Sequence, residues 1–254
     1  MNDSRPSVPS AVKRQLRQES GYGCTFCGHP FIQYHHIIPW REDHHFRPED
    51  MMVLCGNCHY LVTVDSVSEA EQRSGKSRPK NIIDGKSRGR LFVNSTEPIV
   101  SIGGGKFINT PDLVRAGGKS ILSAKVDDGS GRLLVSALIQ DDKGKLLAKI
   151  VNNEWELEIS NVWDFEVFPQ SARIREAPRA VNFFIDCHDD EVRFEGLWNI
   201  DGKSLEFTKE KIVFGNTTYT SPTVINYGCL FDFGHARSLL QLSEFDQCVA
   251  NRAG

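Results

Sequence analysis

Two short cysteine motifs decide how the first part of this chain folds. Residues 24–28 read Cys-Thr-Phe-Cys-Gly, and residues 54–59 read Leu-Cys-Gly-Asn-Cys-His. In each motif two residues separate the cysteines, and this spacing lets both thiolates bind one tetrahedral zinc ion. A site closed by four thiolates is structural, so we expect the zinc to join two segments that are distant in sequence. The predicted zinc ligands are Cys24, Cys27, Cys55 and Cys58.

Histidines are concentrated between and beside these motifs. Six of the eight histidines lie between His29 and His59, and residues 34–39 read Tyr-His-His-Ile-Ile-Pro. So many imidazoles near thiolates indicate metal chemistry in a reducing compartment. The alternatives are a plain zinc ribbon with surface histidines, or redox use of one Cys-x-x-Cys pair. The three remaining cysteines are scattered singly, at Cys187, Cys229 and Cys248.

The composition is that of an ordinary globular protein. Of 254 residues, 39% are hydrophobic and 25% are charged, which argues against a disordered, collagen-like or coiled-coil chain. No apolar run approaches the roughly 20 residues of a membrane span. Residues 1–20 contain four basic side chains in place of the apolar core of a signal peptide. We therefore expect a soluble protein of the cytoplasm.

The net charge of -3 hides a basic front and an acidic back. Residues 1–90 contain 13 Lys and Arg against 10 Asp and Glu, whereas residues 91–254 contain 17 against 23. The most basic run is residues 73–90, which has seven basic side chains and one acid. A polyanion should prefer this part of the chain. A solvated basic linker is the alternative interpretation of the run.

Hydrophobic patterning divides the chain into parts. Ser10 can cap a short helix that Gly21 would end. Residues 66–90 are rich in Ser, Gly, Lys and Arg, lack hydrophobic periodicity and are expected to be a linker. From residue 91 onward, short apolar and β-branched runs alternate with turn signals and predict antiparallel β structure, as a sandwich or a barrel-like sheet. A closing helix is expected from Ala236, Leu239, Leu240 and Phe245.

Three linked pieces of sequence resemble the HNH endonucleases of the zinc-knuckle type. The resemblance covers residues 12–65 and rests on the two cysteine motifs and on His-His-Ile-Ile-Pro at residues 35–39. It implies the small ββα-metal fold of that family. Its two strands would lie at residues 33–38 and 51–54, and its helix would run over residues 57–64.

With this resemblance the whole chain is expected to be α+β with two domains. Residues 1–65 would form the HNH domain with its structural zinc, and residues 66–90 the basic linker. Residues 91–254 would form the mainly antiparallel β domain, closed by the C-terminal helix. The role of that domain is left open between ligand sensing, dimerisation and DNA positioning.

The resemblance also implies roles for individual side chains. His35 would bind a catalytic divalent metal and His59 would complete that site. His36 would be the general base that activates water, a role that suits a pKa near neutral. Neighbouring side chains of a strand point to opposite sides, so His35 and His36 should not share one ion. Asp50 stands where the family has Asn, and it would be either a structural hydrogen-bond acceptor or a group that approaches the metal.

The function implied is hydrolysis of DNA phosphodiester bonds, with Mg²⁺, Mn²⁺ or Ni²⁺ as the catalytic ion and a homodimer to cut both strands. The alternatives are a non-catalytic zinc module that binds DNA while the β domain contacts another protein, and a nuclease for RNA. A nuclease fused to a β-rich partner also resembles effectors of bacterial antiphage defence. His44 and His45 would contact phosphate, supply a ligand or lie in an exposed loop. The candidate DNA contacts are Arg73, Lys76, Arg78, Lys80, Lys86, Arg88 and Arg90.

Overall fold

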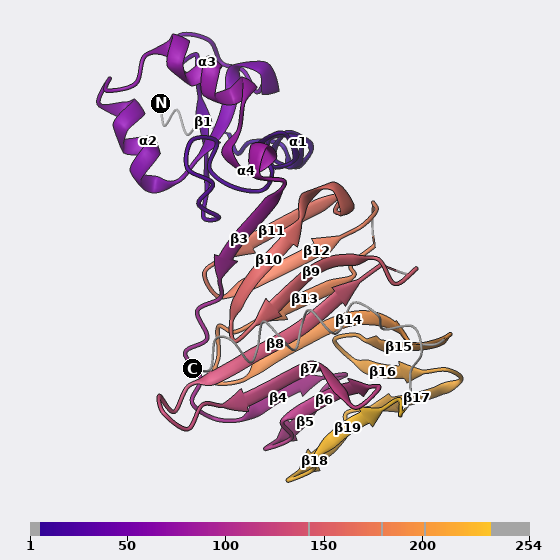
Figure 1. The fold of residues 1–254 in the computed structure, drawn as a ribbon. Helices are drawn as coiled ribbons and strands as arrows, with labels where there is room; N and C mark the ends of the chain where they lie inside the picture. The colour runs from indigo at the N-terminus through magenta and orange to yellow at the C-terminus, as the bar shows by residue number, and fades with distance from the viewer. Residues whose placement is uncertain (1–5, 142, 179, 201, 235–254) are drawn as a thin grey trace. The chain divides into compact units, whose positions relative to one another are not determined.

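The chain divides into two compact units, which are described separately (Figure 1). The computed structural model describes residues 6–141, 143–178, 180–200 and 202–234. Unit 1 comprises residues 1–88 and unit 2 comprises residues 89–254, so strand β3 (Lys86–Arg90) contains the boundary. Among the described helices, none is both long and apolar enough to cross a membrane.

Unit 1 is built around a short β-hairpin. Strands β1 and β2 pair antiparallel, with His35 opposite Met52 and His36 opposite Met51. Helix α1 ends where Gly21 adopts a left-handed φ of 69°, a conformation that glycine takes at little cost. The hairpin and the helix after it agree with the ββα arrangement expected from the sequence. The elements in chain order are α1 (Ser10–Ser20), β1 (Gln33–His36), the 3-10 helix η1 (Pro48–Asp50), β2 (Met51–Leu54), α2 (Gly56–Thr63), α3 (Glu69–Ser77) and α4 (Lys80–Asp84).

Strand β2 is buried along its whole length and contributes to two apolar clusters. Met51 and Val53 pack with Leu16 of α1. Met52 and Leu54 belong to a second cluster, which also contains two of the zinc-motif cysteines and Val62 of α2. Successive side chains of a strand point to opposite faces, so this one strand serves both clusters. The hairpin is therefore covered by α1 on one face and by the cysteine turn and α2 on the other.

Residues 66–90, expected as a linker, contain the helices α3 and α4 and the strand β3 in the structure. Ser68 Oγ accepts from the backbone N–H of Glu71, whose carboxylate accepts from the backbone N–H of Ser68. This reciprocal capping box starts α3 within a polar sequence. In α4 the buried Asn81 places its Nδ2 at 3.1 Å and 3.2 Å from the carbonyl oxygens of Gly21 and Gly28. The sequence of this segment has little hydrophobic periodicity, and hydrogen bonds such as these hold its helices in unit 1.

Unit 2 consists of two mainly antiparallel sheets, as predicted for residues 91–254 (Figure 1). One sheet contains strands in the order β19-β6-β7-β8-β9-β10; the other has the order β11-β12-β13-β14-β15-β16-β17, with β4, β5 and β18 beside this path. The pairings β4 with β14, β5 with β18 and β6 with β19 are parallel. The strands of the first sheet are β6 (Asp112–Ala116), β7 (Lys119–Val126), β8 (Leu133–Gln140), β9 (Leu146–Val151), β10 (Glu154–Glu158) and β19 (Cys229–Asp232). Those of the second are β4 (Ile99–Ile102), β5 (Gly105–Ile108), β11 (Asp164–Phe168), β12 (Ser171–Arg175), β13 (Phe183–Asp186), β14 (Val192–Ile200), β15 (Lys203–Phe207), β16 (Lys211–Phe214), β17 (Thr217–Thr220) and β18 (Thr223–Ile225), and the 3-10 helix η2 (Ile159–Asn161) precedes β11.

The two sheets of unit 2 enclose one apolar core. The ring centroids of Trp155 in β10 and Phe165 in β11 are 4.8 Å apart. The buried Trp198 of β14 donates from Nε1 to the carbonyl oxygen of Leu138 in β8, at 3.1 Å. These contacts join the sheets face to face. The closing helix expected at Ala236, Leu239, Leu240 and Phe245 lies outside the described residues.

Candidate functional site

The four cysteines of the two motifs converge in unit 1. Cys24 and Cys27 lie in the turn before β1, and Cys55 and Cys58 lie at the start of α2. All four Sγ atoms lie within 4.8 Å of one another, and Cys27 Sγ is 3.6 Å from Cys55 Sγ and 3.8 Å from Cys58 Sγ. A tetrahedral zinc with Zn–S bonds of about 2.3 Å requires edges of about 3.8 Å. The donor set and its spacing therefore fit a structural zinc ion.

The protonation of these thiols is sensitive to their surroundings. Burial raises the pKa of Cys27 to about 11, and burial followed by the charge of Cys24 raises the pKa of Cys58. Burial also acts on Cys55, but hydrogen bonds from the Cys58 backbone and from the neighbouring thiols outweigh it and lower the pKa. Zinc binds thiolates, so its binding must release the protons that the metal-free thiols hold.

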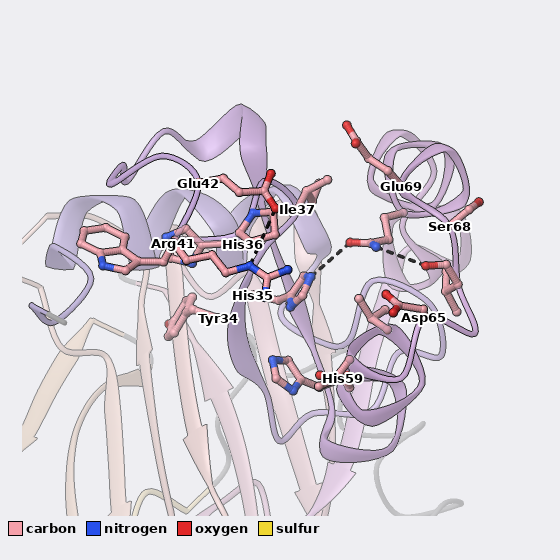
Figure 2. A pocket seen from close by; sticks show the side chains of 16 residues that line it. Tyr34, His35, His36, Ile37, Arg41, Glu42, His59, Asp65, Ser68 and Glu69 are labelled. Carbon is pink, nitrogen blue, oxygen red and sulfur yellow. Dashed lines mark hydrogen bonds and ion pairs between the residues drawn. The ribbon is translucent and has the colours of Figure 1, made fainter. Parts of the chain in front are cut away.

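A cleft of about 860 Å³ opens beside β1 (Figure 2). Its walls come from β1, the loop over residues 37–42, α2 and α3. His35, His36 and His59 all line this cleft, although His59 is 23 positions beyond His36 in the sequence. The structure thus brings together the three histidines to which the family resemblance gave catalytic roles.

His35 and His36 face different neighbours. His35 Nε2 lies 3.1 Å from Gln72 Oε1, and the ring centroids of His35 and His59 are 5.1 Å apart (Figure 2). His36 Nε2 lies 2.9 Å from the carbonyl oxygen of His45. The alternation of side chains along β1 explains this division. His35 and His59 are close enough for both rings to reach one ion.

The hydrogen bond of His36 decides which ring nitrogen carries its proton. A backbone carbonyl oxygen can only accept, so His36 Nε2 must donate to His45 and Nδ1 must carry the lone pair of the neutral ring. His36 is buried, with 5% of the residue's surface exposed, and the centroid of its ring is 5.6 Å from that of Trp40. These contacts hold the imidazole in one orientation.

The two histidines of the loop after β1 differ from each other. His45 is buried; its Nε2 donates to the carbonyl oxygen of Ile38 at 3.2 Å, and its Nδ1 accepts from the backbone N–H of Arg47 at 3.2 Å. His44 is exposed and stacks on Trp40, with ring centroids 4.9 Å apart. His45 therefore supports the loop that holds His36, whereas His44 is open to solvent.

Asp50, which the family resemblance places where that family has Asn, is held by two arginines. Its Oδ2 accepts from Arg47 Nε at 2.9 Å, and its Oδ1 accepts from Arg73 Nη2 at 3.1 Å. The hydrogen bond from Arg47 is the main cause that lowers the pKa of this carboxyl. Burial acts to raise this pKa, and the hydrogen bond from Arg73 lowers it further. Among the described residues that line the cleft, Asp50 is absent. Its observed contacts are those of a structural acceptor that joins α3 to the hairpin.

Three of the predicted DNA contacts are paired with acids of unit 1. Arg73 contacts Glu69 at 2.8 Å as well as Asp50. Two further contacts are Lys76 with Glu19 at 2.7 Å and Lys80 with Asp84 at 2.8 Å. Surface ion pairs contribute only about 0–1 kcal/mol, so such cations can still exchange to phosphate. The exposed members of the predicted set include Arg78, Arg88 and Arg90.

Sequence reasoning missed Gln72. It lies on α3, is 7% exposed and contacts His35 from 37 positions away. The Ser68-x-x-Glu71 pattern is a capping-box signature and was the available signal for α3. Nothing in the sequence indicated that Gln72, the fourth residue of α3, would contact His35.

Comparison with known proteins bears on unit 1. No curated protein matches the chain, and no solved structure matches it. The family model described as HNH endonuclease matches residues 24–64. This range contains the four cysteines and the three histidines of the cleft. Residues 24–64 therefore match the HNH endonuclease family, and the four-cysteine cluster in this range is consistent with the zinc-binding type of that family.

Proposed function

We propose that this protein is a metal-dependent HNH endonuclease that hydrolyses DNA phosphodiester bonds. The observation that carries the proposal is the cleft in which His35, His36 and His59 meet. The family match supports nuclease activity in general. A module that only binds DNA would not need three imidazoles at the same cleft.

His36 is the proposed general base. Its Nε2–H donates to the His45 carbonyl, so the lone pair on Nδ1 is the one that can take a proton from an attacking water. The same carbonyl stabilises the positive charge that the ring then acquires. General-base catalysis of this kind contributes about 10²–10⁴-fold to the rate.

His35 and His59 are the proposed ligands of the catalytic cation. Their ring centroids, 5.1 Å apart, allow both rings to approach one ion. A divalent cation bound there would stabilise negative charge on the phosphate and on the leaving oxygen. Imidazole ligands favour Mn²⁺ or Ni²⁺, while Mg²⁺ is favoured by cellular supply. Apart from the four cysteines, the described residues contain no group of three His, Cys, Asp or Glu whose ligand atoms lie close enough together to hold one ion, so water and DNA phosphate would supply the remaining ligands.

The rest of the chain would support cleavage. The zinc between the four cysteines would be structural and would hold α2, and therefore His59, against the hairpin. The exposed basic residues of the segment 73–90 would contact DNA phosphates. Two copies would cut both strands, one at each site. The combination of a nuclease domain with a separate β unit supports a role as a cytoplasmic antiphage effector in which unit 2 senses a ligand, dimerises or positions DNA.

Two alternatives make different predictions. A non-catalytic zinc module would bind DNA and leave it intact with every divalent metal. A nuclease for RNA would be inhibited by RNA far more strongly than by DNA of the same length. The cleft histidines favour an enzyme over the first alternative, and competition between substrates separates DNA from RNA.

The test is cleavage of supercoiled plasmid by the full chain with Mg²⁺, Mn²⁺ or Ni²⁺. His36→Gln keeps an N–H donor for the His45 carbonyl but has no lone pair on nitrogen, so we expect nicking to fall at least about 10²-fold. His188→Gln is the matched control, because His188 is an exposed histidine of unit 2. Equal cleavage by all three proteins would rule out His36 as the base. DNA binding without cleavage under every condition would favour the non-catalytic module.

A further inference from the structure

Gln72 is a buried polar residue whose side-chain amide makes hydrogen bonds through both its nitrogen and its oxygen. Its Nε2 donates to the carbonyl oxygen of Val67 at 3.3 Å, and its Oε1 lies 3.1 Å from His35 Nε2 (Figure 2). The helix that carries it is fixed by the Ser68 capping box and by the ion pair between Arg73 and Asp50. The backbone that carries the amide is therefore fixed by contacts before Gln72, at Ser68, and after it, at Arg73.

The two hydrogen bonds determine the direction of the amide. The Val67 carbonyl can only accept, so the amide nitrogen must face it and the amide oxygen must face His35. The reverse orientation would place two carbonyl oxygens against each other. Because Gln72 Oε1 can only accept, His35 Nε2 must donate. The neutral His35 ring is therefore protonated on Nε2 and carries its lone pair on Nδ1.

We propose that Gln72 is a positioning residue that fixes His35 in the Nε2-protonated form and so assigns Nδ1 as the metal-binding atom. The metal-binding part of this inference rests on the proposed function. A neutral imidazole binds a metal through its lone-pair nitrogen, and its other N–H is usually held by an acceptor that sets the ring's orientation. Gln72 supplies that acceptor from outside residues 24–64, the range that the family model matches.

The test compares three variants of the full, zinc-loaded chain. Gln72→Met keeps the length of the side chain and removes the oxygen acceptor. Gln72→Glu keeps an oxygen opposite His35 and loses the donor to Val67. Ser68→Ala is the structural control, because it removes the cap of α3 and leaves the Gln72 amide unchanged.

Two measurements separate positioning from a merely structural role. With ¹⁵N-labelled histidine at a pH of about 8, above the usual histidine pKa of about 6.5, two-bond ¹H–¹⁵N correlations identify the protonated ring nitrogen. We expect His35 to carry its proton on Nε2 in the wild type, in Gln72→Glu and in Ser68→Ala, and to become a mixture of tautomers in Gln72→Met. Titration with Mn²⁺, followed by electron paramagnetic resonance, should show 10–100-fold weaker binding in Gln72→Met and near-normal binding in Gln72→Glu.

The outcomes that overturn the inference are distinct from those that overturn the proposed function. A wild-type His35 protonated on Nδ1 would refute it, as would a Gln72→Met variant with unchanged tautomer and unchanged Mn²⁺ affinity. A protein that shows the expected tautomers and Mn²⁺ affinities yet cleaves no nucleic acid would support the role of Gln72 and refute the endonuclease.

Discussion

Unit 1 and unit 2 are stabilised in different ways. Unit 2 encloses a continuous apolar core between two sheets, in which Phe183, Phe194 and Phe207 are almost wholly buried. Unit 1 has two small clusters, one of them built partly from the zinc-motif cysteines, and it buries polar groups such as Gln72 and Asn81. A small unit buries a smaller fraction of its apolar surface than a large one, so metal ligation and buried hydrogen bonds contribute a larger share of its stability. The unit with the weaker apolar core is thus the one that contains the histidine-lined cleft.

The largest effect should come from the zinc ligands. The double variant Cys24→Ser, Cys58→Ser removes two of four ligands, and structural zinc sites contribute about 10–16 kcal/mol. We expect loss of zinc and unfolding of unit 1, while unit 2 stays folded. Elemental analysis and hydrogen exchange would show this as lost protection in β1 and β2 with protection retained in β8 and β14. Cys229→Ser is the control, and a zinc-free double variant with a protected hairpin would contradict the prediction.

Truncation of a buried aromatic side chain in unit 2 should have a smaller effect than loss of the zinc ligands. It should destabilise unit 2 and leave unit 1 unchanged. Phe194 has no exposed surface, and Phe194→Ala should destabilise unit 2 by about 3–5 kcal/mol through lost burial and a cavity. The midpoint of urea unfolding of unit 2 reports the change. Zinc content and the exchange protection of β1 should stay at wild-type values. A loss of zinc in this variant would show that the stability of the two units is coupled.

The smallest effect should come from Asp50, and it should depend on pH. Arg47 first, and Arg73 in addition, hold the pKa of the folded Asp50 below its usual value of about 3.9. The stabilisation is therefore complete above that value and is lost as the pH falls through the folded-state pKa. Asp50→Asn should lower the unfolding free energy of unit 1 at neutral pH, and its difference from the wild type should shrink in acid.

The same titration in unit 2 provides the control for Asp50. Hydrogen bonds from Ser130 lower the pKa of Asp127, which lies in an exposed turn of unit 2. Asp127→Asn should leave the stability of unit 1 unchanged at every pH. A difference between Asp50→Asn and the wild type that is constant with pH would mean that the charge of Asp50 is unimportant.

The zinc-type cluster could be predicted from the sequence because the Cys-x-x-Cys spacing is compatible with a tetrahedral site. The spacing of the two Cys-x-x-Cys pairs predicted the cluster, whereas the hairpin and α2 were predicted from the resemblance of residues 12–65 to the HNH endonucleases. The segment after α2 was not predictable in the same way. Its helices depend on a capping box and on Asn81, and such polar contacts leave no hydrophobic periodicity in a sequence.

The arrangement of unit 2 shows a second limit. Its strands were recognisable from alternating apolar runs, but their partners were not. The parallel pairing of β4 with β14 joins residues more than 90 positions apart, and it depends on packing that no local pattern records. The contact between Gln72 and His35 has the same origin, because both bring together residues that are neighbours only in the folded chain.

The hairpin of unit 1, whose two strands have four residues each, should be sensitive to insertion or deletion of residues. Strand β1 places His35 toward Gln72 and His36 toward His45, and a shift of register by one residue would turn each side chain to the opposite face. The two imidazoles would then exchange their surroundings, although no residue had been substituted. The length of the segment 37–47 is thus as much a determinant of chemistry as the identity of the histidines. Variation in loop length, usually the most tolerated change in a protein, should be poorly tolerated here.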